Sequence, residues 1–578
     1  DPEGEIFLLQ LLAEQQMTAV ERFAAKHSSA EHQPSGRSLS GKYRELLPAE
    51  EPRPGWQYAF EVDLDACSGC KACVVACHTL NGLDDDESWR RVGWIQDTSR
   101  ASAAYVTASC HHCVDPGCLN GCPVLAYEKD CHTGIVHHLD DQCIGCQYCT
   151  MTCPYEVPQY NPRLGVVRKC DMCRQRIDGG EAPACVAACP NEAIKIRLVE
   201  QQSVVRAARG PGEEKHLVAG APPSSVTCPT TTYTSVGGAP AFSFAPRCTE
   251  AGRKHAHLPL AGMLTLSQWS VGTTVAAWGL AWWGNTETTL GDGAFATGWT
   301  PAAKCLSLAW CVMVIAMLVG ALHLGRPLRA WKVFLGWRTS WLSREAIAFA
   351  VYLHLLTCAL GLAVLDIYGF FHGEWMLHGG GWSDGHGWLG AAVGGAMIVG
   401  LMAVVCSVAI YAATHRPAWK FIGTATCFAI ASAMLASAGI AVAMVGSPVG
   451  LGAAWAALSL VFLRVACPYI HLRVSASTSR KRLERLFVLR SLRLARHVGW
   501  SHRAVSRIAL ICSAIVLVGV QFFAIAGPEA HSASGVHSVP GATAGGILAL
   551  LMLLACEWAV RADYFATSVH ATMPQSHR

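Results

Sequence analysis

Sixteen of the 27 cysteines lie in four short groups between Cys67 and Cys189, and this spacing constrains the fold more than any other feature of the chain. The first and third groups follow the pattern C-x2-C-x2-C-x3-C, and their members are Cys67, Cys70, Cys73 and Cys77, and Cys143, Cys146, Cys149 and Cys153. In this spacing three close thiolates hold three corners of one [4Fe–4S] cube, and the fourth binds a second cube. The sequence therefore predicts paired cubes, as in ferredoxins.

The second and fourth groups have longer insertions but keep the x3-Cys-Pro ending, and their members are Cys110, Cys113, Cys118 and Cys122, and Cys170, Cys173, Cys185 and Cys189. Zinc is the alternative for an isolated C-x2-C pair such as Cys170 and Cys173. Zinc sites rarely use three-cysteine runs ending in Cys-Pro, so the four groups together favour iron bound through all sixteen thiolates. The other eleven cysteines, Cys131 among them, form no group, and we expect most to be small apolar residues.

A strand pattern precedes three of the cysteine groups. Apolar and polar residues alternate from Tyr58 to Leu64, and Ile135–Val136 and Val166–Val167 stand before the third and fourth groups. A strand, a ligand loop and a helix make up the repeat of a ferredoxin-type unit, and four groups indicate that the unit is doubled. We therefore predict an α+β double ferredoxin-like domain with four [4Fe–4S] clusters at residues 56–200.

Residues 1–55 form an extension before this domain. Apolar residues recur at helical spacing from Glu5 to about Lys26, which predicts an amphipathic helix. Such a helix either docks on a partner subunit or packs on its own domain, and the sequence does not choose between these. The stretch near Phe7–Leu12 is too short for a signal peptide and lacks a basic flank, so we expect no export signal there.

The composition changes sharply after the cysteine groups. Residues 201–258 are rich in Pro, Gly, Ser and Thr and are expected to form an irregular linker. Residues 259–566 contain eight apolar stretches long enough to cross a bilayer as helices, at Leu260–Trp283, Cys305–Leu324, Ala346–Leu365, Trp388–Ala413, Phe421–Val445, Leu451–Leu472, Ile508–Ala526 and Ala544–Phe565. Gln268 and Arg464 interrupt the first and the sixth. We predict an all-α eight-helix transmembrane bundle and a C-terminal tail at 567–578.

The average composition, 52% hydrophobic and 15% charged with a net charge of +4, describes neither half of such a chain. The long apolar stretches exclude a small secreted disulfide scaffold. The basic run at Arg480–Arg496 lies beside membrane helices, which favours contact with lipid and gives no reason to expect nucleic acid. We find no nucleotide-binding glycine fingerprint, P-loop or flavin motif, so the chemistry of a terminal substrate is expected on another chain.

Basic residues are concentrated in alternate loops between the predicted spans. They are Arg247, Arg253 and Lys254 before the first span, Arg326, Arg329, Lys332, Arg338 and Arg344 after the second, Arg416 and Lys420 after the fourth, and ten between Arg473 and Arg507 after the sixth. By the positive-inside rule both ends of the helical region face the cytoplasm. We therefore expect a multi-pass protein of the bacterial inner (cytoplasmic) membrane, with the cluster domain on the cytoplasmic side.

Ionisable residues inside or at the ends of the spans are candidates for a quinol site, and they are His323, Glu345, Arg464, Glu557 and Arg561. Buried ionisable groups are costly in a membrane unless they pair or line a polar cavity. With the orientation above, all five fall toward the cytoplasmic ends of their helices, where a quinol headgroup could pass protons to a carboxylate or imidazole. Each also has a plainer interpretation as an interfacial side chain or a helix–helix ion pair.

The cysteine-rich region resembles a known family. The motifs are "CSGCKACVVAC", "CHHCVDPGCLNGCP", "DDQCIGCQYCTMTCPYEVP" and "RKCDMCRQRIDGGEAPACVAACP". Over residues of about 56–200 they resemble the iron–sulfur subunit of dimethyl sulfoxide reductase and its relatives in the molybdopterin oxidoreductase family. Some nitrate reductase relatives hold a three-iron cluster where a third-group cysteine is replaced, whereas Cys146 is present here, so the resemblance implies four cubes.

The resemblance also implies which cysteines share a cluster, because the family exchanges the final cysteine between groups. The implied sets are Cys67, Cys70, Cys73 and Cys189 for cluster 1, Cys77, Cys170, Cys173 and Cys185 for cluster 2, Cys110, Cys113, Cys118 and Cys153 for cluster 3, and Cys122, Cys143, Cys146 and Cys149 for cluster 4. Each cluster would then draw ligands from two separate groups of the sequence.

Short motifs in the helical region resemble the membrane-anchor subunit of the same family, which has eight helices and no haem. They are "LHLGRPLRAW", "SWLSREAIAF" and "CEWAVRADYF". The family implicates the histidine of the first motif and the glutamate of the second in quinol binding, and these correspond to His323 and Glu345. Arg464, Glu557 and Arg561 remain weaker candidates, and no haem is expected.

Together these observations predict a quinol-oxidising electron-transfer and anchor subunit. Electrons would pass through four clusters to a separate molybdopterin-containing catalytic subunit, with nitrate, a sulfoxide or another oxyanion as the terminal substrate. One alternative is a quinone-reducing or proton-translocating module of a respiratory complex. Another is a transporter or structural anchor regulated by clusters, which four clusters argue against because a sensor needs one.

Overall fold

The computed structural model describes residues 46–48, 50–96, 103–212, 214–218, 220–236, 258–287, 299–367, 385–445, 447–478, 500–526, 540–566 and 572–574. The helix predicted from Glu5 to about Lys26 lies outside these residues. The chain divides into two compact units, one formed by residues 1–251 together with 571–578 and the other by residues 252–570. The division separates the cysteine-rich region from the apolar helices, as the composition predicts.

A three-stranded sheet in the order β8–β1–β9 organises the first unit. Its strands are β1 (Trp56–Asp63), β8 (Ile194–Glu200) and β9 (Thr232–Thr234). β8 runs antiparallel to β1, with Trp56 opposite Glu200, and β9 runs parallel to it. Tyr58, Phe60 and Val62 of β1 are buried, as the alternating pattern predicts. The strand leads directly into the first ligand loop.

Among the described residues of this unit there are also three two-stranded hairpins and six short helices. The hairpins are β2–β3 (Arg91–Gln96, Ala103–Ala108), β4–β5 (Tyr127–Lys129, Val136–His138) and β6–β7 (Gln159–Asn161, Val166–Arg168). The helices are α4 (Ala72–Leu80), α5 (Gly117–Gly121), α6 (Tyr148–Thr152), α7 (Arg174–Asp178), α8 (Ala184–Ala187) and α9 (Gln201–Arg209). The strands predicted before the third and fourth cysteine groups are β5 and β7. The α+β ferredoxin-like class is therefore confirmed.

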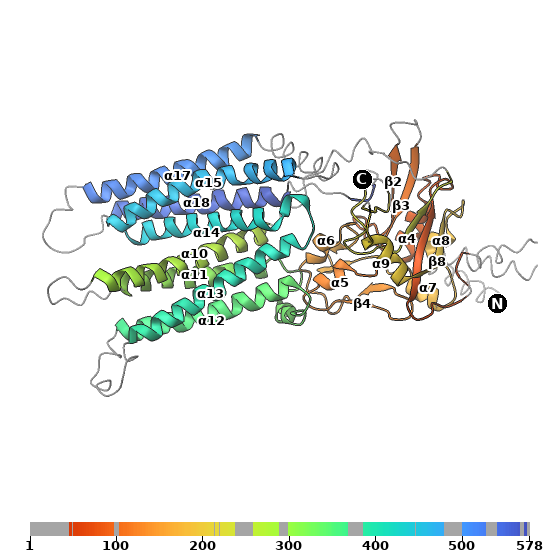
Figure 1. The fold of residues 1–578 in the computed structure, drawn as a ribbon, viewed down its shortest axis with the longest axis horizontal. Coiled ribbons are helices and arrows are strands. Elements are labelled where there is room, and N and C mark those ends of the chain that lie inside the picture. The colour runs from red at the N-terminus through yellow and green to blue at the C-terminus, as the bar shows by residue number, and fades with distance from the viewer. Residues whose placement is uncertain are drawn as a thin grey trace, which may run out of the picture. The chain divides into compact units, whose positions relative to one another are not determined.

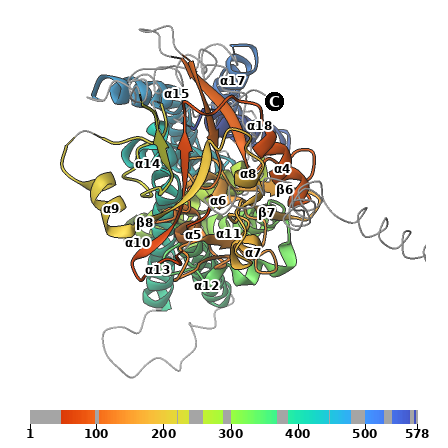
Figure 2. The same cartoon turned by 90° about the vertical axis from the view of Figure 1, so that its right-hand side faces the viewer.

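Part of the predicted linker at 201–258 belongs to this unit, because it contains a helix and a strand that lie in it. α9 continues directly from β8, and it lies at the edge of the unit with none of its residues buried (Figure 2). β9 pairs with β1, and Val218 and Ala221 are buried in the same core as Val62. Composition could not reveal this, because a three-residue strand in a Pro- and Thr-rich segment has too few apolar residues to show a periodicity.

The second unit consists of long helices that run side by side (Figure 1). In the described part of the chain they are α10 (Leu258–Glu287), α11 (Trp299–Ala321), α12 (Trp341–Ile367), α13 (Gly385–Ala412), α14 (Phe421–Ala443), α15 (Pro448–Thr478), α17 (Trp500–Ala526) and α18 (Pro540–Ala566). Short 3-10 helices, η1 (Pro327–Phe334) and η3 (Pro417–Trp419), join α11 to α12 and α13 to α14. Each predicted apolar stretch thus coincides largely with one helix.

Seven of these helices, α11 to α18, are long and apolar enough to cross a membrane within the described residues. The protein is accordingly a multi-pass membrane protein with seven candidate spans. α10 is equally long but carries several polar residues, among them Thr265, Gln268 and Ser270, and these are buried inside the bundle. The interrupted sixth stretch does qualify, as α15. The sequence predicted eight membrane crossings, and the crossing by α10 therefore has weaker support than the sequence suggested.

Two packed apolar cores lie in the described part of the bundle. One is formed mainly by α11, α12 and α13, and includes Phe349 and Tyr352. The other is formed mainly by α14, α15, α17 and α18, and includes Met434 and Leu517. α10 contributes to both cores, which explains how a helix with many polar residues is covered on several sides.

Candidate functional site

Left-handed backbone positions shape the ligand loops of the first and third cysteine groups in the same way. Gly69 and Gly145 have φ of 73° and 69°, and Lys71 and Gln147, two residues later, have φ of 64° and 60°. A side chain at Gly69 would collide with the ring of Tyr105, since an added Cβ would come within 2.5 Å of it. The two ligand loops therefore share one backbone conformation, which supports the repeat inferred from the cysteine spacing.

The thiols interact electrostatically in sets drawn from separate cysteine groups. Cys67 faces Cys70 and Cys189, Cys77 faces Cys170, Cys173 and Cys185, Cys113 faces Cys110, Cys118 and Cys153, and Cys149 faces Cys122, Cys143 and Cys146. These contacts follow the exchange of final cysteines that the family resemblance implies. The fold thus brings the expected residues together, and binding of a cluster by each set stays a prediction.

The third set surrounds a cavity, and this allows the fit of a cluster to be judged. Cys110, Cys113, Cys118 and Cys153 all line the cavity. Among the described residues, no three His, Cys, Asp or Glu side chains converge as a single metal ion would require. A [4Fe–4S] cube takes four thiolates, one on each iron corner, which matches the four cysteines that line the cavity. Burial raises the pKa of Cys153 to about 12, and iron binding would release its proton.

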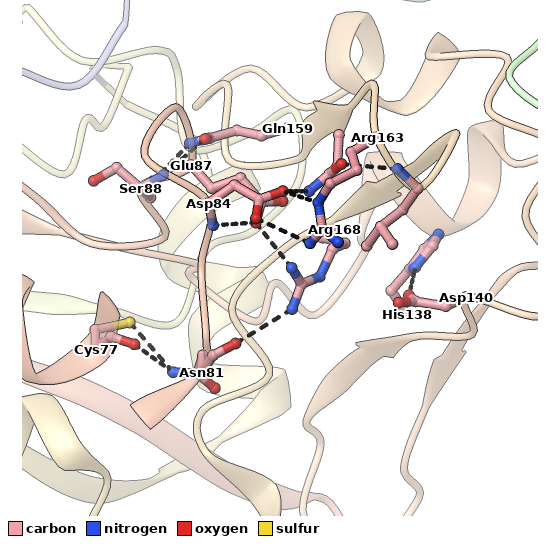
Figure 3. A network of polar contacts seen from close by, with 12 residues as sticks. Cys77, Asn81, Asp84, Glu87, Ser88, His138, Asp140, Gln159, Arg163 and Arg168 are labelled. Carbon is pink, nitrogen blue, oxygen red and sulfur yellow. Dashed lines mark hydrogen bonds and ion pairs between the residues drawn. The ribbon is translucent and has the colours of Figure 1, made fainter. Parts of the chain in front are cut away.

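A polar network fixes the segment after α4 against the β6–β7 hairpin (Figure 3). Asn81 donates to the carbonyl oxygen of Cys77 at 2.8 Å, and Arg168 donates to the carbonyl oxygen of Asn81 at 3.3 Å. Arg168 also pairs with the buried carboxylate of Glu87 at 2.9 Å. Because Arg168 ends β7 just before Cys170, the network holds two distant members of one thiol set in register.

Arg90 is a buried cation that the sequence analysis missed. Its side chain is 2% exposed and donates to Thr107 Oγ1 at 3.1 Å and Ser109 Oγ at 2.9 Å. Burial lowers the pKa of Arg90, but thiols from two sets, led by Cys185 and Cys73, raise it, and the net shift is upward. Positive charge is thus placed beside the first and second thiol sets. Sequence offers no signal for it, because an arginine outside the cysteine motifs looks like any surface residue.

Lys169 is the equivalent cation beside the second and third sets. It is 3% exposed and donates to Cys110 Sγ at 3.7 Å, to the carbonyl oxygen of Cys170 at 2.9 Å and to that of Val136. Burial lowers its pKa, but Cys110, Cys118 and Cys170 raise it, so the net shift is upward. A lysine directly before a ligand cysteine was a visible signal in the sequence, although its burial was not.

In the helix bundle, three of the five predicted site residues form one buried ion network. Arg464 of α15 donates to Glu557 Oε1 of α18 at 2.7 and 3.2 Å. Arg561 donates to the same oxygen at 3.1 Å and to Gln268 Oε1 of α10 at 2.8 Å. Arg561 also stacks over the ring of Phe428, 4.4 Å from its centre. The two residues that interrupt the first and sixth apolar stretches are therefore the two ends of a single network.

This network is not internally complete. Within the described residues, Glu557 Oε2, Arg561 Nη1 and Gln268 Nε2 are buried without a hydrogen-bond partner. The network also contains two cations and one carboxylate, so its charges do not cancel. Buried polar atoms are normally satisfied. These three atoms therefore offer one acceptor and two donors to a polar ligand.

Glu345 forms a second buried centre, between α12 and α13. It is 3% exposed and accepts a hydrogen bond from Ser407 Oγ. Ser407 was not among the sequence candidates, because a serine in a helix carries no signature of this role. His323 is half-buried in the turn that follows α11. The structure thus joins Arg464, Glu557 and Arg561 directly and places Glu345 on different helices.

Both buried centres lie toward the same end of the bundle. Trp558 near the end of α18 donates to the carbonyl oxygen of Leu258 at the start of α10, and Tyr564 bonds Thr424 near the start of α14. Glu345 lies near the start of α12, and Ser407 near the end of α13, which leads through η3 into α14. The two centres are therefore at corresponding depths.

The fold and the thiol sets together define the class of protein. It is an iron–sulfur electron-transfer protein with a helical membrane anchor. Comparison with family models matches residues 101–198 to the 4Fe-4S dicluster domain and residues 263–377 to the DMSO reductase anchor subunit (DmsC). The anchor match includes Gln268, His323 and Glu345 and stops before the remaining candidates.

Individual relatives support the first match. The B subunit of anaerobic dimethyl sulfoxide reductase from Escherichia coli (strain K12) is 39% identical over 155 residues, 25% of this chain and 75% of the relative. The B subunit of the Haemophilus influenzae reductase is 35% identical over 184 residues, 30% of this chain and 86% of the relative. The thiosulfate reductase electron transfer subunit PhsB of Salmonella typhi is 39% identical over 156 residues, 26% of this chain and 80% of the relative. This protein belongs to the family of dimethyl sulfoxide reductase B subunits, and it carries a DmsC-type anchor domain in the same polypeptide.

Proposed function

We propose that this chain oxidises quinol in its helix bundle and relays the electrons through four [4Fe–4S] clusters to a separate molybdopterin-containing catalytic subunit. The observation that carries the proposal is the buried, incomplete polar network of the bundle, in the same polypeptide as the four thiol sets. A polar group buried in apolar surroundings without a partner is costly, and a bound headgroup would remove that cost.

The free atoms of the network match the headgroup of a quinol. Glu557 Oε2 can accept a hydrogen bond from a quinol hydroxyl, and Arg561 Nη1 and Gln268 Nε2 can donate to a carbonyl oxygen of the quinone product. Glu345, held by Ser407, supplies a further carboxylate able to take up a proton at the same end of the bundle. The clusters, when bound, supply one-electron transfer.

The terminal substrate follows from the family only as a class. Relatives are named for dimethyl sulfoxide and thiosulfate reduction. The distribution of basic loops favours a cytoplasmic position for the cluster domain in a bacterial inner membrane, which makes nitrate a further candidate beside sulfoxides and other oxyanions. The catalytic partner would hold the molybdopterin.

The position of the buried carboxylates bears on the alternative of a proton-translocating or quinone-reducing module. In the described part of the bundle the buried carboxylates are Glu345 and Glu557, and both lie toward one end. A proton path across the membrane needs titratable groups spread over its depth. The arrangement therefore favours a binding site at one end, and the direction of electron flow is the point to test.

The test uses membranes with the intact complex and its catalytic partner blocked. Addition of a menaquinol analogue should reduce the clusters, observed by low-temperature electron paramagnetic resonance, and Glu345→Gln or Arg561→Met should abolish this reduction. Dithionite, which does not need the quinol site, should still reduce the clusters in each variant. Quinol-driven reduction at the normal rate in both variants would remove these residues from the site. Purification of the complex without a large subunit containing molybdenum or tungsten would contradict the relay.

A further inference from the structure

Two cysteines of the bundle form a sulfur pair that the cluster chemistry does not use. Cys427 of α14 and Cys467 of α15 are 4% and 8% exposed, and their Sγ atoms lie 3.0 Å apart. Both belong to the eleven ungrouped cysteines, most of which the sequence analysis expected to be small apolar residues. A disulfide bond is about 2.05 Å long, so the two sulfur atoms are about 1 Å from bonding distance.

The surroundings of the pair are cationic and adjoin the ion network. Arg464 lies one helical turn before Cys467, and Arg561 stacks on Phe428, the neighbour of Cys427. Both arginines interact electrostatically with Cys427. A thiol reacts as the thiolate, which nearby positive charge stabilises. The sulfur pair therefore adjoins the residues that the proposed quinol site would use.

Other cysteines of the bundle lack this arrangement. Cys305 is buried in the other apolar core, and Cys512 of α17 is exposed. In the part of the bundle that the structure describes, Cys427 and Cys467 are the only cysteines in contact with each other. The pairing is thus a specific feature of the α14–α15 contact.

We propose that Cys427 and Cys467 are a redox-active dithiol, which bound quinone oxidises to a disulfide that links α14 to α15. The inference rests on the proposed quinone site. Two S–H bonds break and one S–S bond forms, while two electrons and two protons pass to the quinone and form the two O–H bonds of quinol. The disulfide fixes the two helices to each other one turn from Arg464 and so records an oxidised quinone pool in the anchor.

The experiment uses membranes containing the intact complex, divided into two portions. One receives an oxidised short-chain quinone and the other receives the same compound as quinol. Free thiols are then blocked with N-ethylmaleimide, and the protein is digested without reductant for mass spectrometry. A peptide linked through Cys427 and Cys467 should predominate after quinone and be a minor species after quinol.

Variants and a second oxidant make the result decisive. Cys467→Ser should abolish the linked peptide, whereas Cys512→Ser, which alters a lone exposed cysteine, should leave it unchanged. Absence of the linked peptide after quinone, with quinol-driven cluster reduction intact, overturns the dithiol and leaves the proposed function standing. A link formed by diamide but not by quinone also overturns it, because quinone is then not the oxidant. A quinone-dependent link without quinol-driven cluster reduction supports the dithiol and contradicts the relay.

Discussion

Buried positive charge is used differently in the two units of the chain. In the cluster domain, Arg90 and Lys169 each face several cysteine thiols. In the helix bundle, Arg464 and Arg561 share one carboxylate, that of Glu557. The first arrangement places cations beside groups that become anionic when they bind iron. The second leaves an excess of positive charge and free hydrogen-bonding atoms.

This difference is consistent with the two ligands proposed above. A cluster with four thiolate ligands carries net negative charge, and buried cations stabilise its reduced form. A quinone headgroup is neutral, so it needs donors and acceptors more than countercharge. Under the proposed function, the cluster domain would therefore stabilise its clusters by buried positive charge, and the bundle would hold its quinone by hydrogen bonds.

The largest expected effect concerns the thiol sets themselves. Cys110→Ser should remove one cluster, so that iron content falls from about sixteen to about twelve atoms per chain. Cys131→Ser is the matched control, since Cys131 is exposed and lies outside the four sets, and it should keep the full iron content. Colorimetric iron analysis of the purified complex checks both. Equal losses in the two variants would show that the sets are wrongly assigned.

In the bundle, loss of a charge should destabilise the protein far more in the ion network than at the Glu345 centre. Glu557→Gln leaves two buried guanidinium groups without a carboxylate and should lower the free energy of unfolding by about 3–5 kcal/mol. Glu345→Gln keeps an acceptor for Ser407 and should cost about 1 kcal/mol. Thermal unfolding of the detergent-solubilised complex compares the two. Similar losses would mean that the bundle does not depend on pairing these charges.

The cations of the cluster domain should set reduction potentials. Lys169→Met removes a positive charge beside the second and third thiol sets, which should lower the potential of a neighbouring cluster by on the order of 100 mV. Lys215→Met, at an exposed position, is the control. Redox titration followed by electron paramagnetic resonance measures the shift. An unchanged potential in both variants would remove the proposed distinction between the two units.

The smallest effect should come from the neutral partner of Glu345. Ser407→Ala removes one hydrogen bond of about 1 kcal/mol, so quinol-driven cluster reduction should slow about fivefold. Ser459→Ala, an exposed serine of α15 that bonds only its own helix, should have no effect. Stopped-flow measurement of cluster reduction distinguishes them. Identical rates in the two variants would show that Ser407 does not position the carboxylate.

The sequence was sufficient to predict features that depend on a local spacing of residues or on a minimum length of an apolar segment. Cysteine spacing identified the ligand loops, and apolar length identified the helices, because a cube and a bilayer both have fixed dimensions. The interruptions at Gln268 and Arg464 were visible as well. Their partners were not, since Arg561 and Gln268 are 293 residues apart and meet only after the helices pack.

The features that sequence could not reveal depend on burial. Arg90 and Lys169 became candidates only because they are almost fully enclosed beside thiols. Ser407 and the Cys427–Cys467 pair are contacts between neighbouring helices, and their register depends on packing rather than on any motif. β9 likewise joins the sheet across more than 160 residues of intervening chain. Local patterns therefore gave the candidate ligands and left out the side chains that surround them.

The short C-terminal segment at 572–574 has a topological consequence. Met573 is 3% exposed and packs in the core of the cluster domain with Val62 and Ile95. The polypeptide thus leaves that domain before α10 and returns to it after α18. A folded domain stays on one face of a bilayer, so the number of crossings in between must be even. Seven apolar helices lie among the described residues, and we propose that α10 supplies an eighth crossing, with its polar side chains shielded from lipid by the neighbouring helices.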